Sequence, residues 1–203
     1  LILGPLHAVP LLVALELVAG ARLVPEAWSA SEARATASLA IPACLAIPVG
    51  ASLLGALPAA TARRAIALVV LGLVAALATG YRRRGPLRRR VAVAAGTASG
   101  LLSGFAGVGG PPIVLLVLSG AEQAARQRAR LILYFAATQV AATLVFAWRG
   151  WIDGVVLWHL LLVAPGFLLG THIGARRFEP ANERRYRRVG LGLLALAAIP
   201  ALW

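Results

Sequence analysis

The sequence predicts an all-α polytopic membrane protein. Its 203 residues are 60% hydrophobic with a mean hydropathy of +0.84, and only 13% are charged. Long apolar runs alternate with short arginine-rich stretches. A water-soluble protein of this length needs a polar surface that seven acidic and 20 basic residues cannot supply. We therefore expect the lipid bilayer to cover most of the molecule.

The net charge of +13 raises nucleic-acid binding as an alternative. The basic residues are all arginines, and they lie in the joints between apolar runs without interleaved aromatic residues for base stacking. Membrane topology explains this distribution better than DNA or RNA does. We expect no nucleic-acid partner.

Neither a disulfide nor a leader is expected from the sequence. Cys44 is the only cysteine and lies in the apolar run 35–57, which excludes an intrachain disulfide and a cysteine metal cluster. No methionine and no signal-peptide pattern occurs in the chain. We expect that Leu1 is not the natural beginning of the protein.

The apolar segments are expected at 6–24, 35–57, 65–80, 91–118, 131–148, 155–172 and 189–203. If each crossed once, the arginines would divide almost evenly between the two sides, against the positive-inside rule. If 91–118 instead enters and returns on one side, 17 arginines lie on that side and three on the other. The sequence therefore predicts a re-entrant hairpin at 91–118.

The stretch SGFAGVGGPPIVLLVLSG (103–120) carries the expected break of this hairpin. Residues 91–106 should descend as a helix, 107–112 should form a non-helical turn, and 113–118 should return. Glycines permit the turn, and proline suits the first positions of a helix because it lacks an N–H. Broken backbone at this depth must be surrounded by protein or a watery cavity.

A shift of about 116 residues aligns related stretches, which predicts an internal repeat. PVGASLLGAL (48–57) falls on PGFLLGTHIGA (165–175), and LILG (1–4) falls on LVLSG (116–120). Two inverted copies are expected, each a re-entrant hairpin plus three transmembrane helices. We place the first repeat at 1–80, a cytoplasmic arginine-rich linker at 81–90 and the second repeat at 91–203. Roughly 28 residues of the first hairpin are expected to be missing from this chain. Generic apolar composition is the alternative source of the similarity.

The stretch SGLLSGFAGVGGPPIVLLVLSG (99–120) resembles the second signature of the sulfite exporter TauE/SafE family, also called the toluene sulfonate uptake permeases. LHAVPLLVALELVAG (6–20) is similar to the segment after the first signature of that family. The resemblance implies a carrier in the bacterial inner membrane for small sulfur-containing anions such as sulfite, sulfoacetate or other sulfonates, with proton coupling as an option. The first glycine signature is absent, so half of the expected site lies outside this sequence.

The break predicts an anion site, because the N-terminus of a half-helix carries roughly half a positive charge. Its glycines would let anion oxygens approach the backbone, and the serines one turn apart could donate hydroxyls. Tight helix packing is the alternative role of these small residues. The substrate-binding candidates are Ser99, Ser103, Gly107, Gly109, Gly110, Pro111 and Pro112, together with the polar Thr138 and Gln139 inside 131–148.

Glu16 is the proton-coupling candidate, because it stands in the middle of the apolar run VPLLVALELVAG. An ionised side chain at a helix centre costs about 2.5–3.5 kcal/mol on insertion scales, and protonation removes that cost. The alternative is a neutral glutamic acid that bridges two helices.

The histidines and the arginines beyond the hairpin give weaker evidence for a binding site. His7, His159 and His172 are too widely spaced for a shared metal site, and no metal or cofactor is expected. Arg126, Arg128 and Arg130 could attract anions, although contact with lipid headgroups explains them as well.

Three other function classes compete with a secondary transporter. A passive anion channel would also use re-entrant loops. An intramembrane enzyme is less favoured, because no HExxH, GxSxG or paired aspartates occur and no catalytic residue is expected. A structural subunit would not need the intramembrane Glu16. A homodimer is compatible with every one of these classes.

Overall fold

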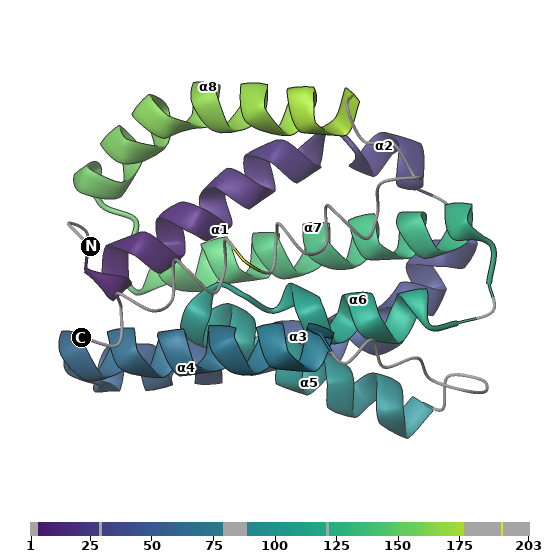
Figure 1. Ribbon diagram of the computed structural model, residues 1–203, viewed down its shortest axis with the longest axis horizontal. Helices are drawn as coiled ribbons and strands as arrows, with labels where there is room; N and C mark the ends of the chain where they lie inside the picture. The colour runs from purple at the N-terminus through teal and green to yellow at the C-terminus, as the bar shows by residue number, and fades with distance from the viewer. Residues whose placement is uncertain (1–3, 29, 79–88, 121, 177–191, 193–203) are drawn as a thin grey trace.

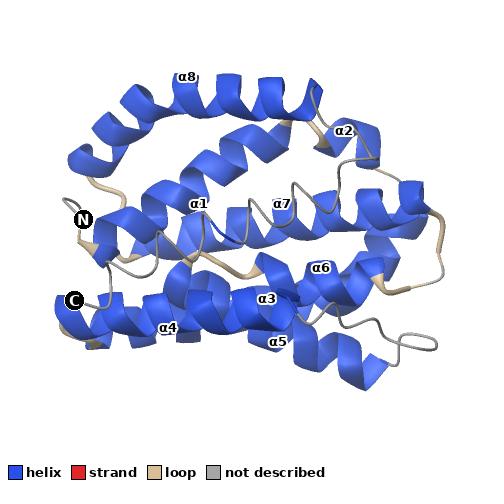
Figure 2. Cartoon of the chain, in the orientation of Figure 1, coloured by secondary structure: helices blue, strands red, loops and turns tan. Residues whose placement is uncertain are grey.

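The computed structural model describes residues 4–28, 30–78, 89–120, 122–176 and 192. Within these ranges the chain forms helices and no strand, which confirms the predicted all-α class (Figure 2). The helices are α1 (Pro5–Ala21), α2 (Val24–Ala27), α3 (Ala30–Ala56), α4 (Ala59–Ala78), α5 (Arg89–Ala106), α6 (Gly110–Leu118), α7 (Ala124–Trp148) and α8 (Gly154–Arg176) (Figure 1). Among the described residues, α3, α4, α7 and α8 are long and apolar enough to cross a membrane. The protein is therefore a multi-pass membrane protein.

Several helices extend beyond the apolar segments expected from hydropathy. Helix α4 begins at Ala59 rather than near residue 65, and α7 begins at Ala124 rather than near residue 131. The added turns contain arginines, which are good helix formers, so the backbone stays helical where the side chains become polar. The short α2 was not predicted, and the segment expected at 189–203 lies outside the described residues apart from residue 192.

The directions of the helices follow from their contacts. Successive glycines of α5 face successive turns of α3 in the same order, so these two helices run parallel. Helices α1 and α7 run antiparallel, because Glu16 contacts Gln139 whereas the earlier Val9 shares a buried cluster with the later Phe146. Helix α8 starts beside the start of α1, where Asp153 contacts His7 (Figure 1).

Helices α3 and α5 approach each other at backbone distance. A Cβ atom added at Gly96, Gly100 or Gly104 would collide with a main-chain carbonyl oxygen of α3, and these oxygens belong to Leu39, Ala43 and Ile47 in that order. Glycines spaced by four residues form one stripe along a helix and allow this approach. We call these three residues the glycine ladder. It holds α5 against α3 and fixes which way the other faces of α5 point.

Two buried clusters lie at different heights along α3, one around its later turns and one around its earlier turns. One cluster joins α1, α3, α4 and α7 and includes Val13, Ile47 and Phe146. The other joins α3, α5, α6 and α7 and includes Leu39, Ile113 and Tyr134. By contrast, α8 exposes most of its apolar side chains, as expected for a helix that faces lipid.

The described arginines separate by the end of the bundle at which they lie. One end carries the ends of α1 and α8 and the starts of α3, α5 and α7; its arginines are Arg22, Arg34, Arg89, Arg90, Arg126, Arg128, Arg130 and Arg176. The other end carries the start of α4 and the end of α7, with Arg63, Arg64 and Arg149. This asymmetry depends on α5 and α6 forming a hairpin rather than one continuous crossing.

Candidate functional site

The helix breaks where the sequence predicts, but the break is shorter. Helix α5 ends at Ala106 and α6 begins at Gly110, so residues 107–109 form the break instead of 107–112. Pro111 and Pro112 are already helical, because the first turn of a helix does not need their missing N–H groups. Gly107 makes the turn with φ +69°, a conformation that favours glycine, and its N–H donates to the Ser103 carbonyl over 3.0 Å.

After the break the chain reverses direction. Ile113 and Val117 of α6 share a buried cluster with Ala92, which lies near the start of α5. Helix α6 therefore runs back along α5, so 89–118 forms a broken-helix hairpin. The depth of this hairpin in a membrane stays a prediction.

Protein surrounds the break on at least two sides. A Cβ atom at Gly107 would lie 3.4 Å from the Leu12 side chain of α1, and one at Gly110 would lie 3.4 Å from the Phe135 ring of α7. These neighbours supply the enclosure that non-helical backbone needs inside a membrane.

The N-terminus of α6 offers unpaired hydrogen-bond donors. Among the described residues, no group accepts a hydrogen bond from the backbone N–H of Gly109 or Gly110. No side chain caps this helix either. Two free N–H groups at the positive end of a helix dipole are suited to an anion.

The two serines occupy different positions around Gly109. Ser99 is fully buried; its hydroxyl donates to the Gly109 carbonyl and accepts a hydrogen bond of 2.7 Å from the Tyr134 hydroxyl. The Ser103 oxygen lies where a Cβ atom of residue 109 would stand. Position 109 must therefore be glycine for α5 and α6 to come this close.

The structure brings Glu16 and Gln139 together, although 123 residues separate them in the sequence. The Gln139 side-chain amide donates to a carboxylate oxygen of Glu16, and Gln139 is buried between α1 and α7. The partner is neutral, so it can donate to Glu16 in either protonation state. This contact joins the proton-coupling candidate to a substrate-binding candidate.

Glu16 also faces the same way as the residues that touch the break. Val9, Leu12 and Val13 of α1 contact the position of Gly107, and Glu16 follows them by one turn on the same face of the helix. The hairpin break and the Glu16 carboxyl group thus share one surface of α1.

Comparison with known proteins agrees with these features. The family model described as "Sulfite exporter TauE/SafE" matches residues 1–200. The chain belongs to this family. It is also 34% identical over 99 residues to the "Probable sulfite/organosulfonate exporter TauE" of Cupriavidus necator, a match that covers 49% of this chain and 39% of that protein. No solved structure matches.

In this TauE/SafE member the Thr138 hydroxyl is engaged within its own helix. It donates to carbonyls of that helix, at 3.0 Å from the Tyr134 oxygen and 3.2 Å from the Phe135 oxygen. This hydroxyl is buried inside the turn of α7. A direct role of Thr138 in binding stays a prediction.

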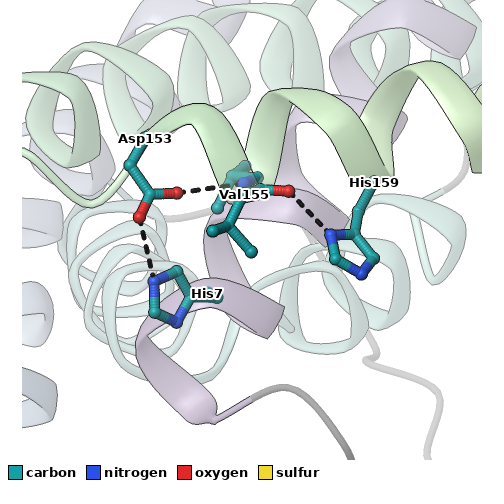
Figure 3. A network of polar contacts seen from close by, with 5 residues as sticks. His7, Asp153, Val155 and His159 are labelled. Atoms are coloured by element: carbon teal, nitrogen blue, oxygen red, sulfur yellow. Dashed lines mark hydrogen bonds and ion pairs between the residues drawn. The ribbon is translucent and has the colours of Figure 1, made fainter.

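His7 takes part in a polar contact at the opposite end of α1 from Glu16 (Figure 3). Its Nε2 atom lies 3.2 Å from Oδ2 of Asp153, whose Oδ1 accepts the Val156 N–H over 3.0 Å at the start of α8. That backbone N–H, aided by His7, holds the pKa of the Asp153 carboxyl below its usual value. This contact fastens the start of α1 to the start of α8.

The other two histidines lie elsewhere. His159 Nδ1 donates to the Val155 carbonyl over 2.7 Å, and His172 is exposed further along α8. The described residues contain no group of three or more His, Cys, Asp or Glu side chains that could hold a metal ion.

The three arginines of α7 lie beyond the end of the hairpin. Arg130 pairs with Glu122 at 2.8 Å, whereas Arg126 and Arg128 are exposed. The pairing with Glu122 engages Arg130 at this end of the bundle, one helical turn before Tyr134.

Sequence reasoning missed Tyr134 and the glycine ladder. Tyr134 is the one tyrosine in α7, and it precedes Thr138 by one helical turn. The ladder shows in the sequence as three glycines at intervals of four. Both patterns are visible in the sequence itself, although the partners that they contact are not.

Proposed function

We propose that the protein is a secondary transporter that moves small sulfur-containing anions, such as sulfite, sulfoacetate or other organosulfonates, across the bacterial inner membrane with proton coupling. Family membership and the named relative support a sulfite or organosulfonate exporter. Because the chain spans only 39% of that relative, the activity of the whole protein is part of the proposal. The observation that carries it is the broken hairpin, whose second half-helix presents unpaired N–H groups beside the α1 face that bears Glu16.

The proposed binding mode uses dipoles rather than a cation. The N–H groups of Gly109 and Gly110 would meet the oxygens of a sulfite or sulfonate group, and the α6 dipole would stabilise its charge. A site without a fixed positive charge binds an anion weakly enough to release it, which a transporter requires. Glu16, one turn along α1, would gain or lose a proton as the site opens to either side.

Flux measurements with the purified protein in proteoliposomes test this function. We expect saturable flux of sulfite and organosulfonates that an imposed pH gradient accelerates, and weaker flux of sulfate and carboxylates. Flux proportional to concentration and insensitive to pH would instead establish the passive channel. Empty liposomes and heat-inactivated protein serve as controls, and the absence of flux for every sulfur anion would refute the proposal.

We also propose that 1–80 and 91–203 are inverted repeats joined by the linker 81–90. The helix directions support this proposal. In the proposed repeat, α1 corresponds to α7 and α3 corresponds to α8. Exchanging the two repeats therefore turns the pair α3 and α7 into the pair α8 and α1. Both pairs are in contact and both run parallel, as the proposed symmetry requires. The antiparallel contact between α1 and α7 then lies on the pseudo-two-fold axis.

The proposed topology predicts which positions an impermeant thiol reagent can reach. In a Cys44→Ser background, single cysteines at Arg90 and Gln123 are expected to react from the cytoplasm, because the hairpin begins and ends on the arginine-rich side. A single cysteine at Ala60, next to the start of α4, is expected to react from the opposite side. Opposite labelling of Arg90 and Gln123 would show that the segment crosses and would remove the inverted repeat.

A further inference from the structure

We propose that Tyr134 is a positioning residue, which acts through Ser99 to aim the N-terminus of α6 at the transported anion. The inference rests on the proposed function, because it concerns the same site. It reassigns Ser99 from a ligand of the anion to a support of the backbone that binds the anion.

A directed chain of hydrogen bonds carries this proposal. The Tyr134 hydroxyl donates to the Ser99 oxygen over 2.7 Å, and the Ser99 hydroxyl donates to the Gly109 carbonyl. Tyr134 is 1% exposed and Ser99 is 0% exposed, so water does not replace these bonds. The chain thereby connects α7, α5 and the first residue before α6.

Through the geometry of the peptide bond, the contact between Ser99 and the Gly109 carbonyl also sets the direction of the Gly110 N–H. The carbonyl of Gly109 and the N–H of Gly110 belong to one planar trans peptide unit, in which they point in opposite directions. Holding the carbonyl against Ser99 therefore directs the Gly110 N–H away from α5. The same contact fixes the orientation of the free donor that we assign to the anion.

The N-terminus of α6 needs such an external support. No side chain caps the helix, and the break contains two glycines, which restrict the backbone least. Two prolines in the first turn remove further hydrogen bonds that could hold it. Without the chain from Tyr134, few interactions would select one orientation of the peptide unit between Gly109 and Gly110.

Tyr134→Phe removes the first link and little else. The ring packs in the buried cluster with Leu39 and Ile113, and it meets the Phe135 ring edge to face at 5.6 Å between centroids. Phenylalanine can make the same packing contacts. Loss of the hydroxyl leaves Ser99 free to rotate away from the Gly109 carbonyl.

The test compares the kinetics of sulfite flux in proteoliposomes. For Tyr134→Phe we expect KM to rise about fivefold, the equivalent of one net hydrogen bond, with the maximal rate within about twofold of the parent. Ser99→Ala is expected to have a similar effect, and the double variant should be no worse than either single one, because all three break the same chain. An unchanged KM in Tyr134→Phe, or additive effects in the double variant, would overturn the proposal.

Thr143→Val is the matched control, because it removes another buried hydroxyl of α7 that has no hydrogen-bond partner. Its KM is expected to equal that of the parent. Amide hydrogen exchange over 107–116 supplies a readout that needs no transport: it should quicken in Tyr134→Phe and Ser99→Ala but not in Thr143→Val. If the parent carries no sulfite, the proposed function fails while this exchange experiment still decides the positioning role. Equal exchange in all variants would refute that role.

If Tyr134→Phe does not fold, Ser99→Thr and Ser99→Ala provide the same comparison. Threonine retains a hydroxyl for the Gly109 carbonyl, whereas alanine does not. The proposal requires exchange over 107–116 to be slower in Ser99→Thr than in Ser99→Ala, and the reverse order would contradict it.

Discussion

Gly100→Ala is expected to destabilise the protein, whereas Gly72→Ala is expected to stabilise it slightly. A Cβ atom at Gly100 would collide with the Ala43 backbone, which cannot move aside as a flexible side chain can. Forced separation of α3 and α5 costs about 1–3 kcal/mol, and more if the backbone cannot adjust. Gly72 also lies inside a helix, but nothing lies within 4 Å of its Cβ position. Alanine there gains about 0.4–1 kcal/mol from the lower freedom of the unfolded chain.

Thermal unfolding of the two purified variants in detergent measures this difference. The midpoint should fall for Gly100→Ala and rise or stay level for Gly72→Ala, and the yield of folded Gly100→Ala from the membrane should fall as well. The paired design separates backbone collision from the general effect of alanine on helices. A shift of both midpoints in the same direction would show that the glycine ladder does not determine the packing.

The glycine ladder also positions the candidate site. Ser99 and Ser103 directly precede Gly100 and Gly104 in the sequence, so they lie about 100° around α5 from the ladder. When the glycines pack on α3, the serines turn toward α6 and α7. The packing of small residues, which the sequence offers as the alternative to a binding role, thus supports that role.

The sequence predicts well those features that depend on single segments. Hydropathy identifies the membrane helices, and the arginine distribution by itself indicates the hairpin. The glycine-proline stretch at 107–112 marks the break correctly, although its length is overestimated. The error arises because proline interrupts the interior of a helix but is compatible with its first turn, and the sequence alone does not say which position it occupies.

Features that depend on contacts between distant segments could not be predicted. Glu16 and Gln139 both stand out as polar residues in apolar helices, but only the antiparallel packing of α1 on α7 shows that they meet. The sequence places Ser99 one turn before Ser103 on the helix that leads to the break, yet the Tyr134 hydroxyl that engages Ser99 comes from another helix. The pattern of polar and apolar residues along the sequence indicates which residues face inward, but it does not identify the residues of other helices that they contact.

Replacement of Glu16 by glutamine is expected to abolish the response to a pH gradient without abolishing exchange of the anion. Glutamine keeps the shape of the side chain, and its carbonyl oxygen can still accept the hydrogen bond from Gln139. It cannot release a proton. If Glu16 couples transport, the ratio of flux with a gradient to flux without one should fall to about one, because neither conformation then binds a proton more tightly than the other.

Glu26→Gln is the matched control for this experiment. Glu26 lies in the short α2 at the arginine-rich end and is exposed, so its replacement removes one negative charge without altering the interior. Its gradient response should equal that of the parent. Flux of sulfite is measured in proteoliposomes with and without an imposed gradient, and exchange at equal pH on both sides shows that each variant remains folded and able to bind.

The contact with Gln139 makes the outcome decisive between the two roles of Glu16. If the carboxyl group only bridges α1 and α7, glutamine can replace it with no loss of transport. Only an apolar substitution such as Glu16→Leu would then reduce stability and transport, because it leaves the buried Gln139 amide without its partner. A coupling carboxyl group gives the opposite pattern, with Gln already removing the gradient response while exchange persists. A gradient response in Glu16→Gln equal to that of the parent would therefore exclude Glu16 from coupling and leave it a bridge between helices.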